Sequence, residues 1–140
     1  MQALTHLNLA SCKLEAVPLE LRSLTALRAL DLASNLIYDL PSTLHTLSGL
    51  RSLKVQRNRL HTVPAVLTLL TCLTALDLSG NEMLYTAVAP RVAALPELVD
   101  FQFPAPFESF SWDLANVRSS HWPVPTTCKL KSSQVLTNVP

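Results

Sequence analysis

Apolar residues return along this chain at a fixed interval of 23 positions. Leucines begin four similar segments, and within each segment the first, fourth and sixth positions are aliphatic. Side chains alternate between the two faces of a strand, so the apolar–polar alternation around these positions predicts a short β-strand. Units of this length stack on their neighbours to bury their apolar faces, and the interval therefore predicts a repeat architecture. The four segments are LTHLNLASCKL from Leu4, LRALDLASNLI from Leu27, LRSLKVQRNRL from Leu50 and LTALDLSGNEM from Leu73.

The second half of each unit has a different spacing. An aliphatic residue and a proline precede leucines that lie three positions apart, as in Val17-Pro18 before Leu21 and Leu24. This spacing predicts a helical or 3-10 turn, and a proline fits the first turn, where its nitrogen needs no hydrogen-bond partner. Strands stack about 4.8 Å apart, whereas helices need about 8–10 Å. The stack is therefore expected to curve, with the sheet on its inner side.

The combined pattern, LxxLxLxxNxLxxLPxxLxxLxx, resembles the 23-residue class of leucine-rich repeats that is common in intracellular proteins. The resemblance covers residues 1 to about 103. It implies an α/β solenoid, a leucine-rich-repeat horseshoe with a short parallel sheet on the concave face and helical or 3-10 turns on the convex face. It also implies the general role of such arrays, which serve as scaffolds and regulators of signalling or cytoskeletal complexes by binding other proteins.

The ninth position of each unit carries a polar side chain or a cysteine among apolar neighbours. A side-chain amide has donors and an acceptor for the backbone groups exposed where the chain turns out of a strand. Stacked one per repeat, these amides are expected to form a buried ladder along the arc, with a cysteine as a weaker donor in the first unit. The ladder positions are Cys12, Asn35, Asn58 and Asn81.

The repeats end in an irregular unit. After Met83 the leucine–proline pattern is lost, and the interval resumes two residues late with a fifth strand at 98–103. Pro104 then ends this strand, because proline cannot donate to a continuing ladder. We therefore expect a repeat domain at 1–103, with four repeats and a terminal fifth strand. Residues 104–140 are expected to form an aromatic, proline- and serine-rich cap with a disordered tail, and an aromatic docking peptide is the alternative.

The first repeat has no polar unit in front of it. Residues 1–4 align with residues 24–27, which places Met1 at an interior apolar position. Solenoids are expected to carry capping repeats with a polar outer face at both ends. Either the chain is a fragment of a larger leucine-rich-repeat protein whose activity lies outside these residues, or its uncapped N-terminal end self-associates. The fragment interpretation is favoured.

Charge and composition narrow the classes of partner and compartment. The net charge of +1 provides no general attraction to nucleic acid or acidic membranes. No apolar stretch approaches the roughly 20 residues of a membrane span. The first residues lack a basic segment ahead of an apolar run, so no signal peptide is expected. The three cysteines are odd in number and far apart, which fits free thiols in the cytoplasm, with the nucleus as the alternative.

Candidate binding residues lie around the strand leucines, where they are expected to face the concave side. Between residues 50 and 72 there are four basic residues and no acidic ones. Asp31, Lys54 and Asp77 are expected to be cross-strand neighbours that pair for roughly 0.2–1 kcal/mol each, which leaves the arginines of this repeat without obvious partners. The first interpretation is a solvated charged face, the second an acidic protein partner, and the least favoured a phosphoinositide or nucleic acid. The partner-binding candidates are Arg28, Asp31, Arg51, Lys54, Gln56, Arg57, Arg59 and Asp77.

The sequence offers little for catalysis or metal binding. Its four histidines fall in different units and at different positions of the repeat. It contains no nucleophile elbow, HExxH motif, glycine-rich phosphate loop or cysteine–histidine cluster with metal spacing. We expect no enzymatic activity, no cofactor, no metal and no small-molecule substrate. The sequence predicts a module that binds a protein partner through its concave face.

Overall fold

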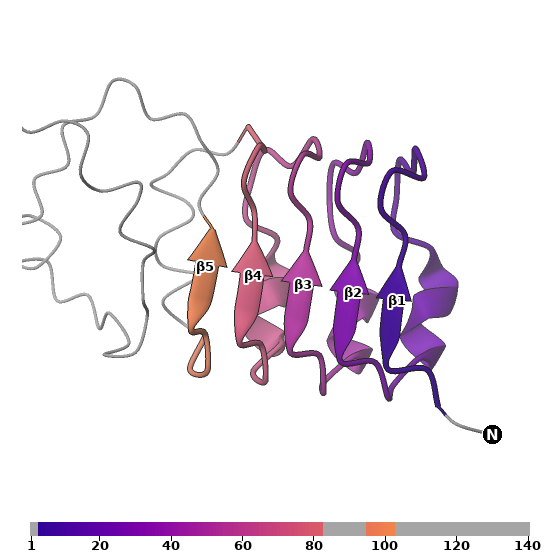
Figure 1. Ribbon diagram of the computed structural model, residues 1–140, viewed down its shortest axis with the longest axis vertical. Helices are drawn as coiled ribbons and strands as arrows, with labels where there is room; N and C mark the ends of the chain where they lie inside the picture. The colour runs from indigo at the N-terminus through magenta and orange to yellow at the C-terminus, as the bar shows by residue number, and fades with distance from the viewer. Residues whose placement is uncertain (1–2, 83–94, 103–140) are drawn as a thin grey trace, which may run out of the picture.

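The computed structural model describes residues 3–82 and 95–102, and within these ranges the chain forms one five-stranded parallel sheet (Figure 1). The strands follow chain order, and each pairs with the strand of the next unit. Leu7 pairs with Leu30, and Leu30 with Leu53, which is the predicted 23-residue register. Between the last two strands Leu76 pairs with Phe101, which matches the late start of the fifth unit. The strands are β1 (His6–Asn8), β2 (Ala29–Asp31), β3 (Ser52–Lys54), β4 (Ala75–Asp77) and β5 (Asp100–Gln102).

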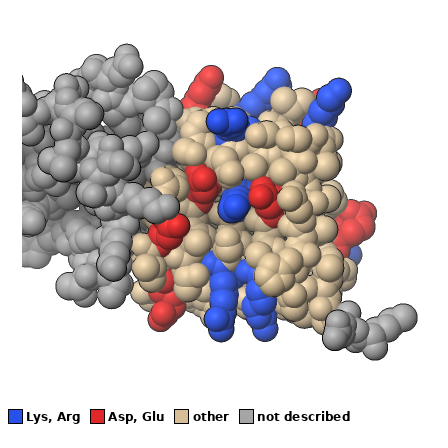
Figure 2. Space-filling view, viewed as in Figure 1, with Lys and Arg blue, Asp and Glu red and all other residues tan. Residues whose placement is uncertain are grey.

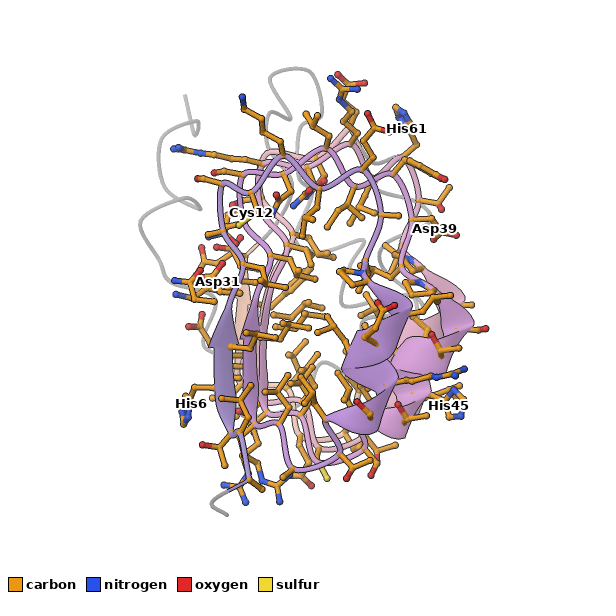
Figure 3. All side chains as sticks on the ribbon, turned by 90° about the vertical axis from the view of Figure 1, so that its right-hand side faces the viewer. His6, Cys12, Asp31, Asp39, His45 and His61 are labelled. Atoms are coloured by element: carbon orange, nitrogen blue, oxygen red, sulfur yellow. The ribbon has the colours of Figure 1, made fainter. Side chains whose placement is uncertain are left out.

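Three units return through a short 3-10 helix on the side opposite the sheet (Figure 3). A proline stands immediately before each helix with ψ between 130° and 146°. Its carbonyl oxygen accepts a hydrogen bond from the N–H three residues later, at 3.0–3.2 Å. The prolines therefore cap the helices instead of entering the first turn as the sequence predicts, because the i→i+3 bonding of a five-residue helix begins at the proline carbonyl. The prolines are Pro18, Pro41 and Pro64, and the helices are η1 (Leu19–Ser23), η2 (Ser42–Thr46) and η3 (Ala65–Leu69).

Leucines from the two layers form one continuous core. The first leucine of the second, third and fourth units is fully buried, and so is the strand residue Leu53. The middle leucine of each helix is buried against this core, as Leu44 shows. Sheet and helices thus cover one apolar layer between them, and the helices, which need the wider spacing, lie on the outer side. The predicted solenoid, with its sheet on the concave face, is confirmed.

Asparagine side chains join each unit to the one before it. The Oδ1 atom of Asn58 accepts a hydrogen bond from the backbone N–H of Ile37 at 3.0 Å. Its Nδ2 atom donates to the carbonyl oxygens of Leu32 in the preceding unit and Val55 in its own, both at 2.9 Å. The side chain therefore satisfies backbone groups that the parallel ladder leaves open. The corresponding side chains of Asn35 and Asn81 bond in the same way, and all three are buried.

The first unit is less covered than the others. Cys12 occupies the asparagine position but is exposed, and its Sγ contacts the Ala10 carbonyl oxygen at 3.5 Å. Leu4 is 46% exposed, and Leu7 and Leu9 are only partly buried, whereas their counterparts in the second unit are at most 1% exposed. Within the described residues nothing covers the outer side of β1, and this leaves Cys12 outside the buried row formed by the asparagines.

The chain leaves each of the first four strands through a left-handed residue at the eighth position of the unit. The φ angle is 58° at Ser11, 54° at Ser34 and Arg57, and 66° at Gly80. The N–H of Arg57 donates to the Ser79 carbonyl oxygen of the next unit at 2.8 Å, and the equivalent bonds recur in the two earlier units. Neighbouring units therefore hold this turn in place, although a non-glycine residue adopts it at a cost of about 1–2 kcal/mol.

The aromatic cap expected at 104–140 lies outside the described residues, as do Phe103 and the irregular segment 83–94. In the ranges that are described, no helix has the length and apolar character needed to cross a membrane.

Candidate protein-binding face

The candidate site is the exposed side of the sheet, which we call the sheet face. Its middle row consists of the small side chains Ala29, Ser52 and Ala75, which are register partners on neighbouring strands. These leave two shallow hollows, one over β1–β3 and one over β3–β5. Basic groups gather toward both ends of the strands, and acidic groups lie across the middle and toward β5 (Figure 2). The hollow over β3–β5 is lined by Ser52, Lys54, Ala75, Asp77, Asp100 and Gln102.

The polar residues at the ends of β1, β2 and β4 hold the turns that follow them. The Oδ1 atoms of Asn8, Asp31 and Asp77 each accept a hydrogen bond from the backbone N–H two residues later, at 2.8–3.0 Å. The Ser79 hydroxyl adds a second bond to the Asp77 Oδ1, at 2.6 Å. One oxygen of each carboxylate thus fixes local structure, and the other remains for a different partner.

Lys54 provides the charged residue at the end of β3. Its Nζ lies 3.9 Å from the Asp31 Oδ2, and the lysine side chain is 54% exposed. The pairing expected with Asp31 is therefore present, whereas no ion pair joins Lys54 to Asp77. The ammonium group of Lys54 therefore lies toward Asp31 on β2 and not toward Asp77 on β4. An exposed ion pair of this kind contributes little to stability.

Arg28 differs from the other basic candidates because its guanidinium is engaged. Its Nη1 donates to the carbonyl oxygens of Gly49 at 3.2 Å and of Leu27 at 3.4 Å. A Cβ atom at Gly49 would overlap this guanidinium, so the absence of a side chain there makes the approach possible. Arg28 therefore bridges two units and has only part of its donors left for a partner.

The remaining basic residues of the third unit do not form one patch. Arg51 precedes β3, whereas Arg57 and Arg59 follow it. Six residues of extended chain span at most about 20 Å, so Arg51 and Arg57 lie at opposite ends of the strand with Lys54 between them. All three arginines are exposed, and their side chains make no ion pair or hydrogen bond with the described residues.

Gln56 is partly buried, unlike the arginine that follows it. Its Oε1 atom is buried and has no hydrogen-bond partner among the described residues. A buried carbonyl oxygen of this kind cannot reach a docked protein directly.

The fifth strand adds two side chains that are not among the candidates predicted from the sequence. Asp100 is the register partner of Ala75, and Gln102 that of Asp77. The Gln102 Nε2 donates to the Asp100 Oδ1 at 3.1 Å. Both residues occupy polar positions of the LxxLxL pattern at 98–103, which is the signal in the sequence that could have identified them.

Within the described ranges, no group of three His, Cys, Asp or Glu side chains is arranged to hold a metal ion. His61 lies 3.8 Å from Glu82, and both side chains are largely exposed. The His6 ring accepts or donates a bond with its neighbour Thr5 at 2.9 Å. Both of these contacts lie at the exposed surface of the protein.

Comparisons with known proteins agree with this architecture. The family model described as leucine rich repeat matches residues 70–84. A leucine-rich-repeat protein from Leptospira interrogans is similar in structure, with a TM-score of 0.66 and 28% sequence identity over 71% of this chain. Internalin C2 from Listeria monocytogenes has a TM-score of 0.62 and 23% identity over 69% of this chain, a likeness that concerns the fold.

These matches are partial in length. The chain spans 25% of the Leptospira protein and 40% of the internalin. No curated protein sequence matches it significantly.

Proposed function

This chain is a leucine-rich-repeat protein, and we propose that it is a non-catalytic interaction module that binds a protein partner through the sheet face. One observation carries the proposal: the face presents charged side chains on a rigid backbone, and several of them lack a partner among the described residues. Arg51 and Arg57 are exposed, and hydrogen bonds to the neighbouring units hold the backbone N–H of each. Because the backbone is already held, a partner has to order only the side chains, which limits the conformational cost of binding to complementary charges.

We place this function in a scaffold or adaptor of signalling complexes, in the cytoplasm or nucleus. The free thiols of Cys12 and Cys72 support a reducing compartment, since both are exposed. The shallow form of both hollows supports a protein partner over a small molecule, because small ligands are mostly enclosed in deep apolar pockets.

Charge reversal on the sheet face tests the proposal. The variant Arg51→Glu, Lys54→Glu, Arg57→Glu is expected to lose at least about tenfold in the amount of each specific partner captured from a cell lysate, which corresponds to about 1.4 kcal/mol. The matched control reverses charge on the convex side with Arg22→Glu, an exposed residue of η1. Quantitative mass spectrometry of the captured proteins gives the readout. Equal capture by the sheet-face variant and the wild type would refute the site.

An anionic phosphate partner is the weaker candidate, because Arg51 lies at the opposite end of β3 from Arg57 and Arg59. Nucleic acids and phosphoinositide surfaces use a continuous basic field. Sedimentation with vesicles containing phosphatidylinositol bisphosphate distinguishes an anionic lipid surface from a protein partner. The wild type is expected to remain in the supernatant.

Self-association through the outer edge of β1 is a second candidate. The exposed Leu4 and the partly buried Leu7 and Leu9 favour it, because they form an apolar surface beside a strand edge that no other described strand pairs with. Such edges readily pair with another chain. The occupant we propose is a second copy of this chain, which gives a particle mass that rises with protein concentration.

A further inference from the structure

We propose that the partner of the sheet face is a segment of mixed charge: it places a basic side chain between Asp77 and Asp100 and an acidic side chain on Arg51. This inference rests on the proposed function and specifies the chemistry of the partner. It replaces a uniformly acidic partner, which the basic residues of the third unit suggest when they are considered alone.

The distribution of unpaired charge carries the inference. Lys54 is the one cation in the row that ends β2–β4, and its ammonium is paired with Asp31 on the β2 side. Asp77, Asp100 and Arg51 have no ion pair within the described residues. The sheet face is thus negative over β4–β5 and positive beside the start of β3. A partner with one sign of charge would be attracted by one region and repelled by the other.

The geometry of the hollow over β3–β5 fits a basic side chain. Its lining includes the small residues Ser52 and Ala75, and carboxylates border it on two neighbouring strands. Lys54 also lines it, but its ammonium group is paired with Asp31 of β2. The Ser79 bonds orient the Asp77 carboxylate, and the Gln102 amide orients that of Asp100. In each case the bonds end on Oδ1, which leaves Oδ2 to accept a hydrogen bond. A guanidinium has five donors in one plane and can bond two carboxylates at once.

The spacing of the two regions defines the segment. The register partner of Arg51 on the fourth unit is the residue three positions before Asp77. Three residues along the strand and one strand across give a separation of about 11 Å. In an extended segment this is the distance between residues about three positions apart. The partner is therefore expected to carry Arg or Lys about three residues from Asp or Glu.

A displayed library of random 12-residue peptides tests the inference with the full chain as bait. The wild type is expected to enrich peptides with this spacing of opposite charges at least fivefold over the unselected library. Asp77→Asn together with Asp100→Asn should remove the enrichment of the basic residue, and Arg51→Gln should remove that of the acidic one. Asparagine preserves the turn at position 77, because Asn8 makes the same hydrogen bond in the first unit. The matched controls are Glu20→Gln and Arg22→Gln on η1, which should leave the enrichment unchanged.

Each contrary result has a definite meaning. One contrary result is the enrichment of uniformly acidic peptides, which Arg51→Gln removes and the two asparagine substitutions leave unchanged. This result would overturn the mixed-charge partner and leave the proposed function standing. Enrichment that no sheet-face variant changes, or no enrichment at all, would contradict both. Co-sedimentation of the wild type with vesicles containing phosphatidylinositol bisphosphate, lost in Arg51→Gln, would overturn both in favour of an anionic lipid surface.

Discussion

At the scale of the residue, the contrast between Asn58 and Cys12 shows what the ninth position of the repeat does. The Asn58 side chain is buried and makes three hydrogen bonds of 2.9–3.0 Å to backbone atoms of two units. Cys12 is exposed and contacts one carbonyl oxygen at 3.5 Å. The same position thus carries a bridge between units at Asn58 and a solvent-facing thiol in the first unit, where no further unit among the described residues packs against it.

Replacing Asn58 with leucine should therefore lower the free energy of unfolding by about 1–3 kcal/mol, because buried backbone groups lose their hydrogen-bond partner. Cys12→Leu is the control, and it should change stability by less than about 0.5 kcal/mol. Urea unfolding followed by circular dichroism measures both. Equal midpoints for Asn58→Leu and the wild type would show that the bridging bonds do not contribute.

At the scale of the element, the strand ends decide how the sheet face is presented. Strands of three residues are too short to fix the direction of the chain beyond them, and a side chain at the end of β1, β2 and β4 accepts the N–H two residues later. In β3 this position is Lys54, which has no acceptor, and the following turn relies on the bond from Arg57 to Ser79 in the next unit. The third unit thus lacks this local hydrogen bond and carries a positive charge at the same position.

Asp77→Ala should destabilise the protein by about 1 kcal/mol, because the Ser79 N–H and hydroxyl lose their acceptor. Asp77→Asn should cost less than half as much, since an amide oxygen accepts the same bond. The two free energies come from denaturant titrations of both variants. If alanine and asparagine proved equal, the effect would be one of charge instead of the turn.

At the scale of the whole molecule, each described unit is stabilised by contacts with its neighbouring units. Each strand pairs with the next in sequence, and each helix contacts the next helix. In such an array the end units are held on one side, so they are the least stable. The outer edge of β1 combines this weakness with the exposed Leu4 and the partly buried Leu7 and Leu9, which supports the second copy proposed to cover it.

The substitution Leu4→Lys should abolish the rise of mass with concentration, because it places a charge in the apolar contact. The monomer should tolerate the change, since Leu4 is already 46% exposed in it. Leu19→Lys provides the control, since Leu19 is 56% exposed on the first helix. Multi-angle light scattering across a hundredfold range of concentration measures the mass. A wild type that stays monomeric throughout the range would contradict self-association through β1.

The sequence by itself determined the architecture of this protein. Its 23-residue interval located the first four strands, set their register and identified the buried leucines, because these units pack on their neighbours through the same contacts. The fifth strand was located by the LxxLxL pattern, which resumes two residues late. The same logic placed the asparagines at the junctions between units.

Only the tertiary structure decided the character of the sheet face. Exposed side chains are not constrained by the repeat, so their partners depend on where each long side chain lies. Lys54 pairs with Asp31 and not with Asp77, the Arg28 guanidinium reaches over Gly49, and the arginines of the third unit separate to the two ends of β3. Packing of a core follows from periodicity, whereas the pairing of surface charges follows from positions that periodicity leaves free.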